Sequence, residues 1–188
     1  MADIACFVER YTTSRAEEMT ALVNFKLAAH QLGHRMEYVY RQDIDRIPSF
    51  DALFIRSLTD PLNAAYVASR MAELHGMRVI DDPDSIIICC DKINMYMHLL
   101  RAGIKIPETR FIGKRELDRR TMEGLFGELG TPLILKAPHT SFSMHVDKVE
   151  SVHAFQETAR KYFRRADEIV VQRFIPSRFD WRVTTLNG

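Results

Sequence analysis

The feature that most constrains the fold is a regular alternation of short apolar runs with helical segments in residues 1–80. Leu22, Phe25 and Ala29 recur at helical spacing before Gly33, and residues 63–75 form a second helical segment. The apolar runs, each read as a strand, cover residues 4–9, 36–40, 52–55 and 78–80. Because strands that alternate with helices of this length form parallel sheets with helical crossovers, the sequence predicts an open parallel α/β sandwich.

The second half of the chain has a different order of predicted elements, with more strands than helices. A polar junction at residues 81–85 leads to an apolar run, and a predicted helix at 92–102 then ends at Gly103. Strands are predicted at 110–112, 133–137, 146–149, 168–175 and 180–186, and helices at 114–129 and 151–163. The pattern therefore predicts a first unit of about 80 residues, followed after the junction by a second part of mixed strands and helices.

Composition excludes several classes of protein. Lys plus Arg number 26 and Asp plus Glu 25, a balance that implies no bulk electrostatic binding to nucleic acid or anionic lipid. No apolar run approaches the ~20 residues of a membrane helix, and no leader sequence is evident. The three cysteines, Cys6, Cys89 and Cys90, suit neither a disulfide framework nor a zinc knuckle. We expect a reducing, cytoplasmic setting, with the cysteines as small buried apolar residues.

Lys136 is the first residue with an evident chemical role. It ends the apolar strand at 133–137, and the loop that follows holds the hydroxyls of Thr140, Ser141 and Ser143. An ammonium beside hydroxyls and free backbone N–H groups forms a cradle for phosphate. The alternative is a lysine whose stem packs at a strand end while its charge stays in water.

Lys92 is a second candidate. It follows Asp91 at the start of a predicted helix, where a helix N-terminus and a cation together favour anions. The alternative is an ordinary capped helix with a solvated lysine. No local motif links Lys92 to Lys136, so only the tertiary fold can bring them together. His139 and His145 flank the loop but offer a metal only two ligands, so no metal site is predicted in this chain.

The last part of the sequence carries three further predictions. The strand ending at Ile175 leaves the sheet through Pro176, and its backbone could face a flat heterocycle. Asp180 and Arg182 would lie on one face of the final strand, as a binding pair or as an ordinary surface ion pair, with Trp181 directed into the core. The terminal Asn-Gly is a hairpin signal, so we expect the N-terminal portion of a longer chain rather than a mobile tail.

Taken in order, these stretches resemble the N-terminal part of an ATP-grasp ligase of the RimK-like and glutathione-synthetase type. The resemblance covers about residues 50–188. The matching segments are residues 80–85, 90–92, 99–109, 132–138, 141–143, 146–149, 172–176 and 179–182. The resemblance implies a pre-ATP-grasp parallel α/β domain over residues 1–90, followed over residues 91–188 by the first, partial ATP-grasp α+β subdomain.

The resemblance also implies an activity, the ATP-dependent joining of a carboxylate to an amine through an acylphosphate. Lys92 and Lys136 match the lysines that bind phosphate, and Ser141 and Ser143 lie in the loop that closes on it. The segment matching the adenine hinge consists of Gln172, Arg173, Phe174 and Ile175, and Asp180 matches the acidic residue near the ribose. The family also implies Mg²⁺ for the complete protein, whose metal ligands lie in its second half.

Two residues depart from the pattern of relatives. His145 stands where a glycine is common, and Arg173 stands where a glutamate is common. The prediction is the N-terminal portion of a RimK-like ligase that adds an amino acid such as glutamate to a peptide or protein, inactive by itself. The alternatives are a non-catalytic nucleotide-binding or interaction module and an unrelated α/β binding protein. Association with further copies of the same chain, as a homo-oligomer, is compatible with the sequence.

Overall fold

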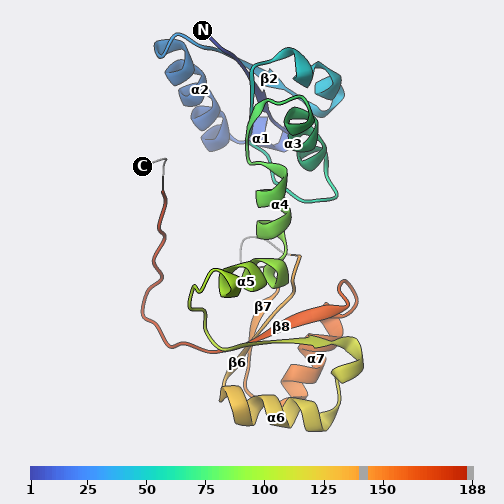
Figure 1. Ribbon diagram of the computed structural model, residues 1–188. Coiled ribbons are helices and arrows are strands. Elements are labelled where there is room, and N and C mark those ends of the chain that lie inside the picture. Colours follow the sequence, from blue (N-terminus) through green and yellow to red (C-terminus); the bar gives the residue numbers. More distant parts are fainter. Residues whose placement is uncertain (140–143, 186–188) are drawn as a thin grey trace. The chain divides into compact units, whose positions relative to one another are not determined.

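The computed structural model describes residues 1–139 and 144–185. The chain divides into two compact units, Met1–Cys90 and Asp91–Gly188 (Figure 1). No helix of the described residues is both long and apolar enough to cross a membrane. The first unit contains a parallel sheet and the second an antiparallel sheet, which confirms the predicted α/β plus α+β fold class.

The first unit is built on a four-stranded parallel sheet in the order β2-β1-β3-β4. Its strands are β1 (Asp3–Phe7), β2 (Arg35–Val39), β3 (Ala52–Ile55) and β4 (Arg78–Ile80). The helices are α1 (Arg10–Thr13), α2 (Ala16–Gln31), α3 (Ala64–Leu74) and α4 (Pro83–Cys90), with a 3₁₀ segment η1 (Arg41–Ser49). Parallel neighbours require crossover connections, and the intervening helical segments supply them.

Local chemistry sets where these helices begin and end. The Asn63 side chain accepts a hydrogen bond from the Tyr66 N–H at the start of α3. Gly33 follows α2 with φ of 78°, a left-handed conformation that glycine adopts without strain. The predicted helix end at Gly33 is therefore confirmed.

The second unit is built on a four-stranded antiparallel sheet in the order β5-β8-β6-β7. Its strands are β5 (Thr109–Gly113), β6 (Leu133–Lys136), β7 (Val146–Val149) and β8 (Glu168–Arg173). The helices are α5 (Lys92–Arg101), α6 (Arg119–Leu129) and α7 (Val152–Tyr162), with a short 3₁₀ turn η2 (Lys114–Glu116).

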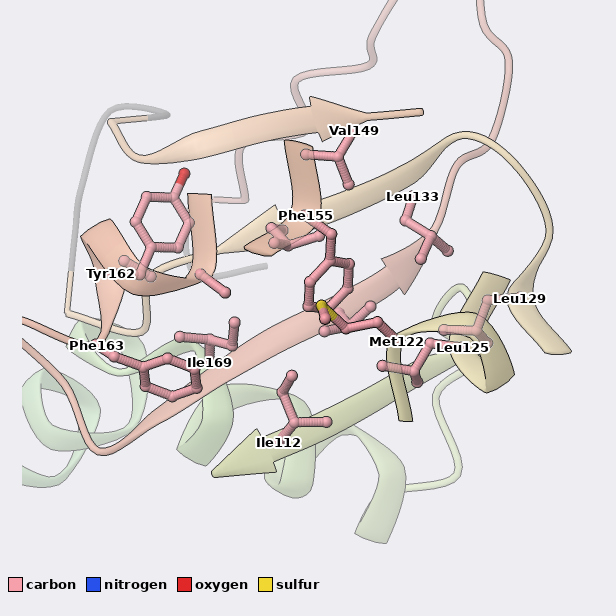
Figure 2. Packing of buried hydrophobic residues seen from close by; sticks show 14 residues of the cluster. Ile112, Met122, Leu125, Leu129, Leu133, Val149, Phe155, Tyr162, Phe163 and Ile169 are labelled. Carbon is pink, nitrogen blue, oxygen red and sulfur yellow. The ribbon is translucent and has the colours of Figure 1, made fainter. Parts of the chain in front are cut away.

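The core of this unit lies between the sheet and helices α6 and α7 (Figure 2). The helices contribute Met122, Leu125, Leu129, Phe155 and Tyr162, and the strands contribute Ile112, Leu133, Leu135, Val149, Ile169 and Val171. On β6, Leu133 and Leu135 are buried while Ile134 and Lys136 are only half-buried. Since successive strand residues point to opposite faces, this alternation directs Lys136 away from the core.

The predicted strand at 180–186 is wrong over its described part. Residues 180–185 have no regular secondary structure, and β8 ends at Arg173 rather than at Ile175. Trp181 is 83% exposed and does not enter the core. An extended segment becomes a strand only by pairing with a neighbour, and residues 180–185 pair with no strand of the described chain.

The prediction that all three cysteines are buried is also wrong. Cys6 on β1 is fully buried, but Cys89 is exposed and Cys90 is half-buried. The apolar run that contains Cys89 winds into α4, where neighbouring residues face different directions. Only part of such a run can therefore face the core, and Ile86 does so.

We expect Phe155→Ala to reduce the free energy of unfolding by about 3–5 kcal/mol, because Phe155 is 0% exposed and its removal leaves a cavity between α7 and the sheet. Phe179→Ala is the matched control, since Phe179 is 64% exposed and should change stability by less than ~0.5 kcal/mol. Urea unfolding of both variants measures the difference. Equal losses would contradict the assignment of Phe155 to the core.

Candidate functional site

Lys136 lies at the end of β6 on the face of the sheet opposite the α6/α7 core. Its ammonium donates hydrogen bonds to the Tyr96 hydroxyl at 2.8 Å and to Gln172 Oε1 at 2.7 Å. The same ammonium lies 5.4 Å from the centre of the Tyr96 ring. Residues from β6, β8 and α5 thus hold one cation in a defined position.

Gln172 is in turn held in place by the sheet. It is 5% exposed, and its Nε2 donates to Thr109 Oγ1 at 2.8 Å on the neighbouring strand β5. With one end of the amide bound to Thr109, the other end presents its oxygen to Lys136. The Gln172 side chain therefore orients Lys136, a role that the sequence interpretation, which assigned Gln172 to a backbone hinge, did not include.

Lys92 opens helix α5 at the same end of β6. Asp91 caps this helix by accepting from the Ile93 N–H at 2.7 Å. The Lys92 ammonium donates to the Ala137 carbonyl at 3.1 Å, and the Lys92 N–H donates to the Pro138 carbonyl at 3.1 Å. Since Ala137 directly follows Lys136, the structure places both lysines at one edge of the second unit.

The ionisation of Lys92 is affected by its surroundings, including the Lys136 ammonium. Burial lowers the pKa of Lys92, the charge of Lys136 lowers it further, and Asp91 acts in the opposite direction. A buried cation beside another cation is unfavourable until an anion arrives. This arrangement is suited to binding a group of several negative charges, such as a polyphosphate.

The hinge segment predicted from the sequence begins in β8 and continues past its end. Arg173 is the last residue of β8, and its Nε donates to Glu108 Oε2 at 2.6 Å. Phe174 and Ile175 follow the strand, and the Lys148 ammonium lies 5.0 Å from the centre of the Phe174 ring. The Arg173 side chain is thus directed to Glu108, whereas the peptide groups of Phe174 and Ile175 lie beyond the sheet ladder.

The remaining predicted site residues are not gathered here. Asp180 is exposed in the segment without regular structure and makes no hydrogen bond or ion pair with the described residues. Ser141 and Ser143 lie outside the described residues. The described part of the candidate site therefore consists of Lys92, Lys136 and the hinge.

Tyr96 and Thr109 were not identified from the sequence as site residues. For Tyr96 a signal existed, because it lies four residues after Lys92 on a predicted helix and so shares its face. For Thr109 no local signal existed, since its contact with Gln172 joins strands β5 and β8, which are distant in sequence.

His145 adopts a left-handed backbone conformation, with φ of 54°. Glycine reaches this region freely, and histidine reaches it at some cost, although less than a β-branched residue would. The departure noted in the sequence is therefore accommodated by a glycine-like backbone. The His145 ring packs edge-on against Tyr162 at 5.7 Å between ring centres.

Among residues 1–139 and 144–185, no group of three or more His, Cys, Asp or Glu side chains is placed to hold a metal ion. The described residues therefore do not fit a Mg²⁺ site by themselves.

Curated proteins with related sequences are ligases. The chain is 30% identical over 103 residues to the glutamate–LysW ligase ArgX of Sulfolobus acidocaldarius and 31% identical over 103 residues to that of Sulfurisphaera tokodaii. Each alignment spans 55% of this chain but only 34% of the relative. No family model matches the chain.

Solved structures share the fold over nearly the whole chain. A RimK-domain ATP-grasp protein from Sphaerobacter thermophilus superposes with a TM-score of 0.68 and 24% identity, covering 94% of this chain and 65% of that one. The D-alanine–D-alanine ligase of Bacillus anthracis complexed with ATP gives 0.67 and 16%, covering 94% and 60%. The resemblance to RimK-like ATP-grasp ligases is thus confirmed, and the chain has the fold of about 60–65% of each of these two structures.

Replacing Lys136 by methionine should raise the pKa of the Lys92 ammonium, because one of the two causes of its depression is removed. An NMR titration of the Lys92 side-chain signals measures this pKa. Lys148→Met deletes the same charge from β7 and should leave the pKa of Lys92 unchanged. A Lys92 pKa that is equal in both variants would contradict the coupling.

The sign of the effect on stability follows from the lowered pKa. Because the folded pKa of Lys92 lies below the unfolded value, the protonated lysine opposes folding at pH values below both. This opposition is relieved as the pH rises from the folded pKa towards the unfolded one.

Proposed function

We propose that this chain is the leading portion of a RimK-like ATP-dependent carboxylate–amine ligase that adds an amino acid such as glutamate to a peptide or protein. Residues 1–90 would form the pre-ATP-grasp domain and residues 91–188 the first part of the ATP-grasp domain. The similarity to glutamate–LysW ligases supports the substrate class.

The observation that carries the proposal is the pairing of Lys92 and Lys136 at one edge of the second unit. Two ammonium groups held by a carbonyl, a phenol and an amide form a positive, partly desolvated surface. Charge-assisted hydrogen bonds to phosphate oxygens are the natural use of such a surface. We assign both lysines to the phosphates of ATP, together with Ser141 and Ser143.

The hinge supplies the second half of the nucleotide site in this proposal. Phe174 and Ile175 make no backbone hydrogen bond with other described residues, so their peptide groups are available to a flat base. The backbone from Gln172 to Ile175 would hold adenine, and Asp180 would accept from the ribose hydroxyls. Arg173 would act through its carbonyl, since its side chain pairs with Glu108 and its N–H donates to the Glu108 carbonyl at 2.8 Å.

The reaction follows from this placement. A substrate carboxylate attacks the γ-phosphorus, the bond to the β,γ-bridging oxygen breaks, and ADP leaves with its electron pair. An amine then attacks the acylphosphate carbon, loses a proton and expels phosphate. Lys92 and Lys136 would offset the negative charge on the phosphates. The Mg²⁺ expected for the complete protein would be held by residues outside the part of the chain that the structure describes, and it would offset further charge on the phosphates.

Lys136→Ala should weaken binding of a non-hydrolysable ATP analogue roughly tenfold to a hundredfold, the equivalent of a lost charge-assisted hydrogen bond. Lys114→Ala is the matched control, because Lys114 carries the same charge on an exposed side chain in η2 and belongs to no part of the proposed site. Calorimetric titration of both variants measures the difference.

Equal affinities of the two variants would remove Lys136 from the nucleotide site. The ligase step is tested separately on the full-length protein that the gene encodes. The measurement is the release of ADP, which should require both glutamate and a peptide acceptor. Nucleotide binding without any such release would favour the non-catalytic binding module.

A further inference from the structure

A chain of hydrogen bonds runs from Lys136 across the sheet of the second unit and ends on a backbone carbonyl. The Lys136 ammonium donates to Gln172 Oε1 at 2.7 Å, and Gln172 Nε2 donates to Thr109 Oγ1 at 2.8 Å. The Thr109 hydroxyl in turn donates to the Pro107 carbonyl at 2.6 Å. Every donor in this chain therefore points the same way, from Lys136 towards the start of β5.

The strand register explains why these side chains meet. Thr109 on β5 lies directly opposite Gln172 on β8, so the two side chains share one face of the sheet. On the other side of β8, Gln172 lies opposite Ile134 of β6, two residues before Lys136. Diagonal neighbours of this kind are within reach of long side chains. The arrangement is thus built into the pairing of three strands.

The donors and acceptors available fix which way the Gln172 amide faces. A carbonyl only accepts, so the single hydroxyl proton of Thr109 is directed to Pro107. Thr109 Oγ1 can then only accept, which turns the amide nitrogen of Gln172 towards it. An ammonium only donates, so Lys136 requires the amide oxygen. Both ends of the amide therefore require the same orientation.

Burial makes this orientation costly to lose. Gln172 is 5% exposed, and Tyr96, the other partner of Lys136, is 8% exposed. Water has little access to replace a partner that such a side chain loses, and an unpaired buried polar group is destabilising. The hydroxyl of Thr109 therefore controls the acceptor that Gln172 presents to Lys136.

The two acceptors of the Lys136 ammonium are both neutral, a phenol from Tyr96 and an amide from Gln172. Lys148, by contrast, pairs with the carboxylate of Glu150 at 3.1 Å. Neutral acceptors orient an ammonium without cancelling its charge. An ammonium has three N–H donors, and within the described part of the chain these acceptors take two of them. One donor and the full charge are thus left for an anion.

We propose that Thr109 is a positioning residue for Lys136. Its hydroxyl, anchored on the Pro107 carbonyl, fixes the Gln172 amide. That amide holds the ammonium in the direction in which it binds the phosphates of ATP. The inference rests on the proposed function, because the anion that Lys136 serves is the nucleotide. Thr109 itself contacts no ligand and acts only through Gln172.

The test is Thr109→Val in the full-length protein, which keeps the branched shape but removes the hydroxyl. Gln172 Nε2 then has no acceptor on β5, so its side-chain amide NMR signals should lose their protection from solvent exchange. Affinity for a non-hydrolysable ATP analogue should fall roughly threefold to tenfold, the equivalent of one neutral hydrogen bond. Thr109→Ser retains the hydroxyl and should restore both. If Thr109 acted through packing of its methyl group, valine would succeed and serine would fail.

Thr121→Val is the matched control. Thr121 is also half-buried, and its hydroxyl donates to Asp118 Oδ2 at 3.0 Å at the start of α6, away from Lys136. This variant should change the affinity less than twofold and leave the Gln172 signals unaltered. Unaltered Gln172 signals in Thr109→Val, or a serine variant that behaves like the valine variant, would overturn the proposal.

Lys136→Ala, measured in the same titration, separates this inference from the proposed function. Loss of affinity in Lys136→Ala with wild-type affinity in Thr109→Val would refute the role of Thr109 and leave the nucleotide site in place. Wild-type affinity in Lys136→Ala would refute the nucleotide role of Lys136, and the role of Thr109 with it.

Discussion

The direction of the Lys136 side chain depends on the alternation of buried and half-buried residues along β6, which also builds the core of the second unit. Leu133 and Leu135 point into the layer between β6 and helices α6 and α7, so the intervening and following residues must face the other way. The burial that stabilises the sheet thereby presents an ammonium group on its opposite face. The same strand therefore supplies core residues and the candidate site lysine. A shift of register by one residue would move Lys136 to the core face and the leucines to the opposite face.

A cation in that position needs fixed partners, and three elements provide them. Tyr96 reaches Lys136 from α5, Gln172 reaches it from β8, and Thr109 on β5 holds the far end of the Gln172 amide. Lys92 adds a second charge through the carbonyl of Ala137. The lowered pKa of Lys92 reflects its burial first and the neighbouring charge of Lys136 second, and an anionic ligand would offset both costs.

Features of the structure that depend on neighbouring residues in the sequence could be predicted. Features that depend on the pairing of one strand with another could not. The end of α2 at Gly33 follows from the backbone freedom of glycine, and the strand at β6 follows from a continuous apolar run. The predicted strand at 180–186 was wrong because alternation shows that a segment can pair, not that a partner is present. Cys89 was misplaced because its apolar run winds into a helix.

The sequence by itself determined the fold class, the two lysines and the order of motifs that resembles RimK-like ATP-grasp ligases, because these depend on residue type and spacing along the chain. The tertiary structure alone decided that Lys92 and Lys136 lie at one edge and that Gln172 orients Lys136 with its side chain. Each of these depends on contacts between residues far apart in sequence, and the physical reason is that sheet pairing, not spacing, brings such residues together.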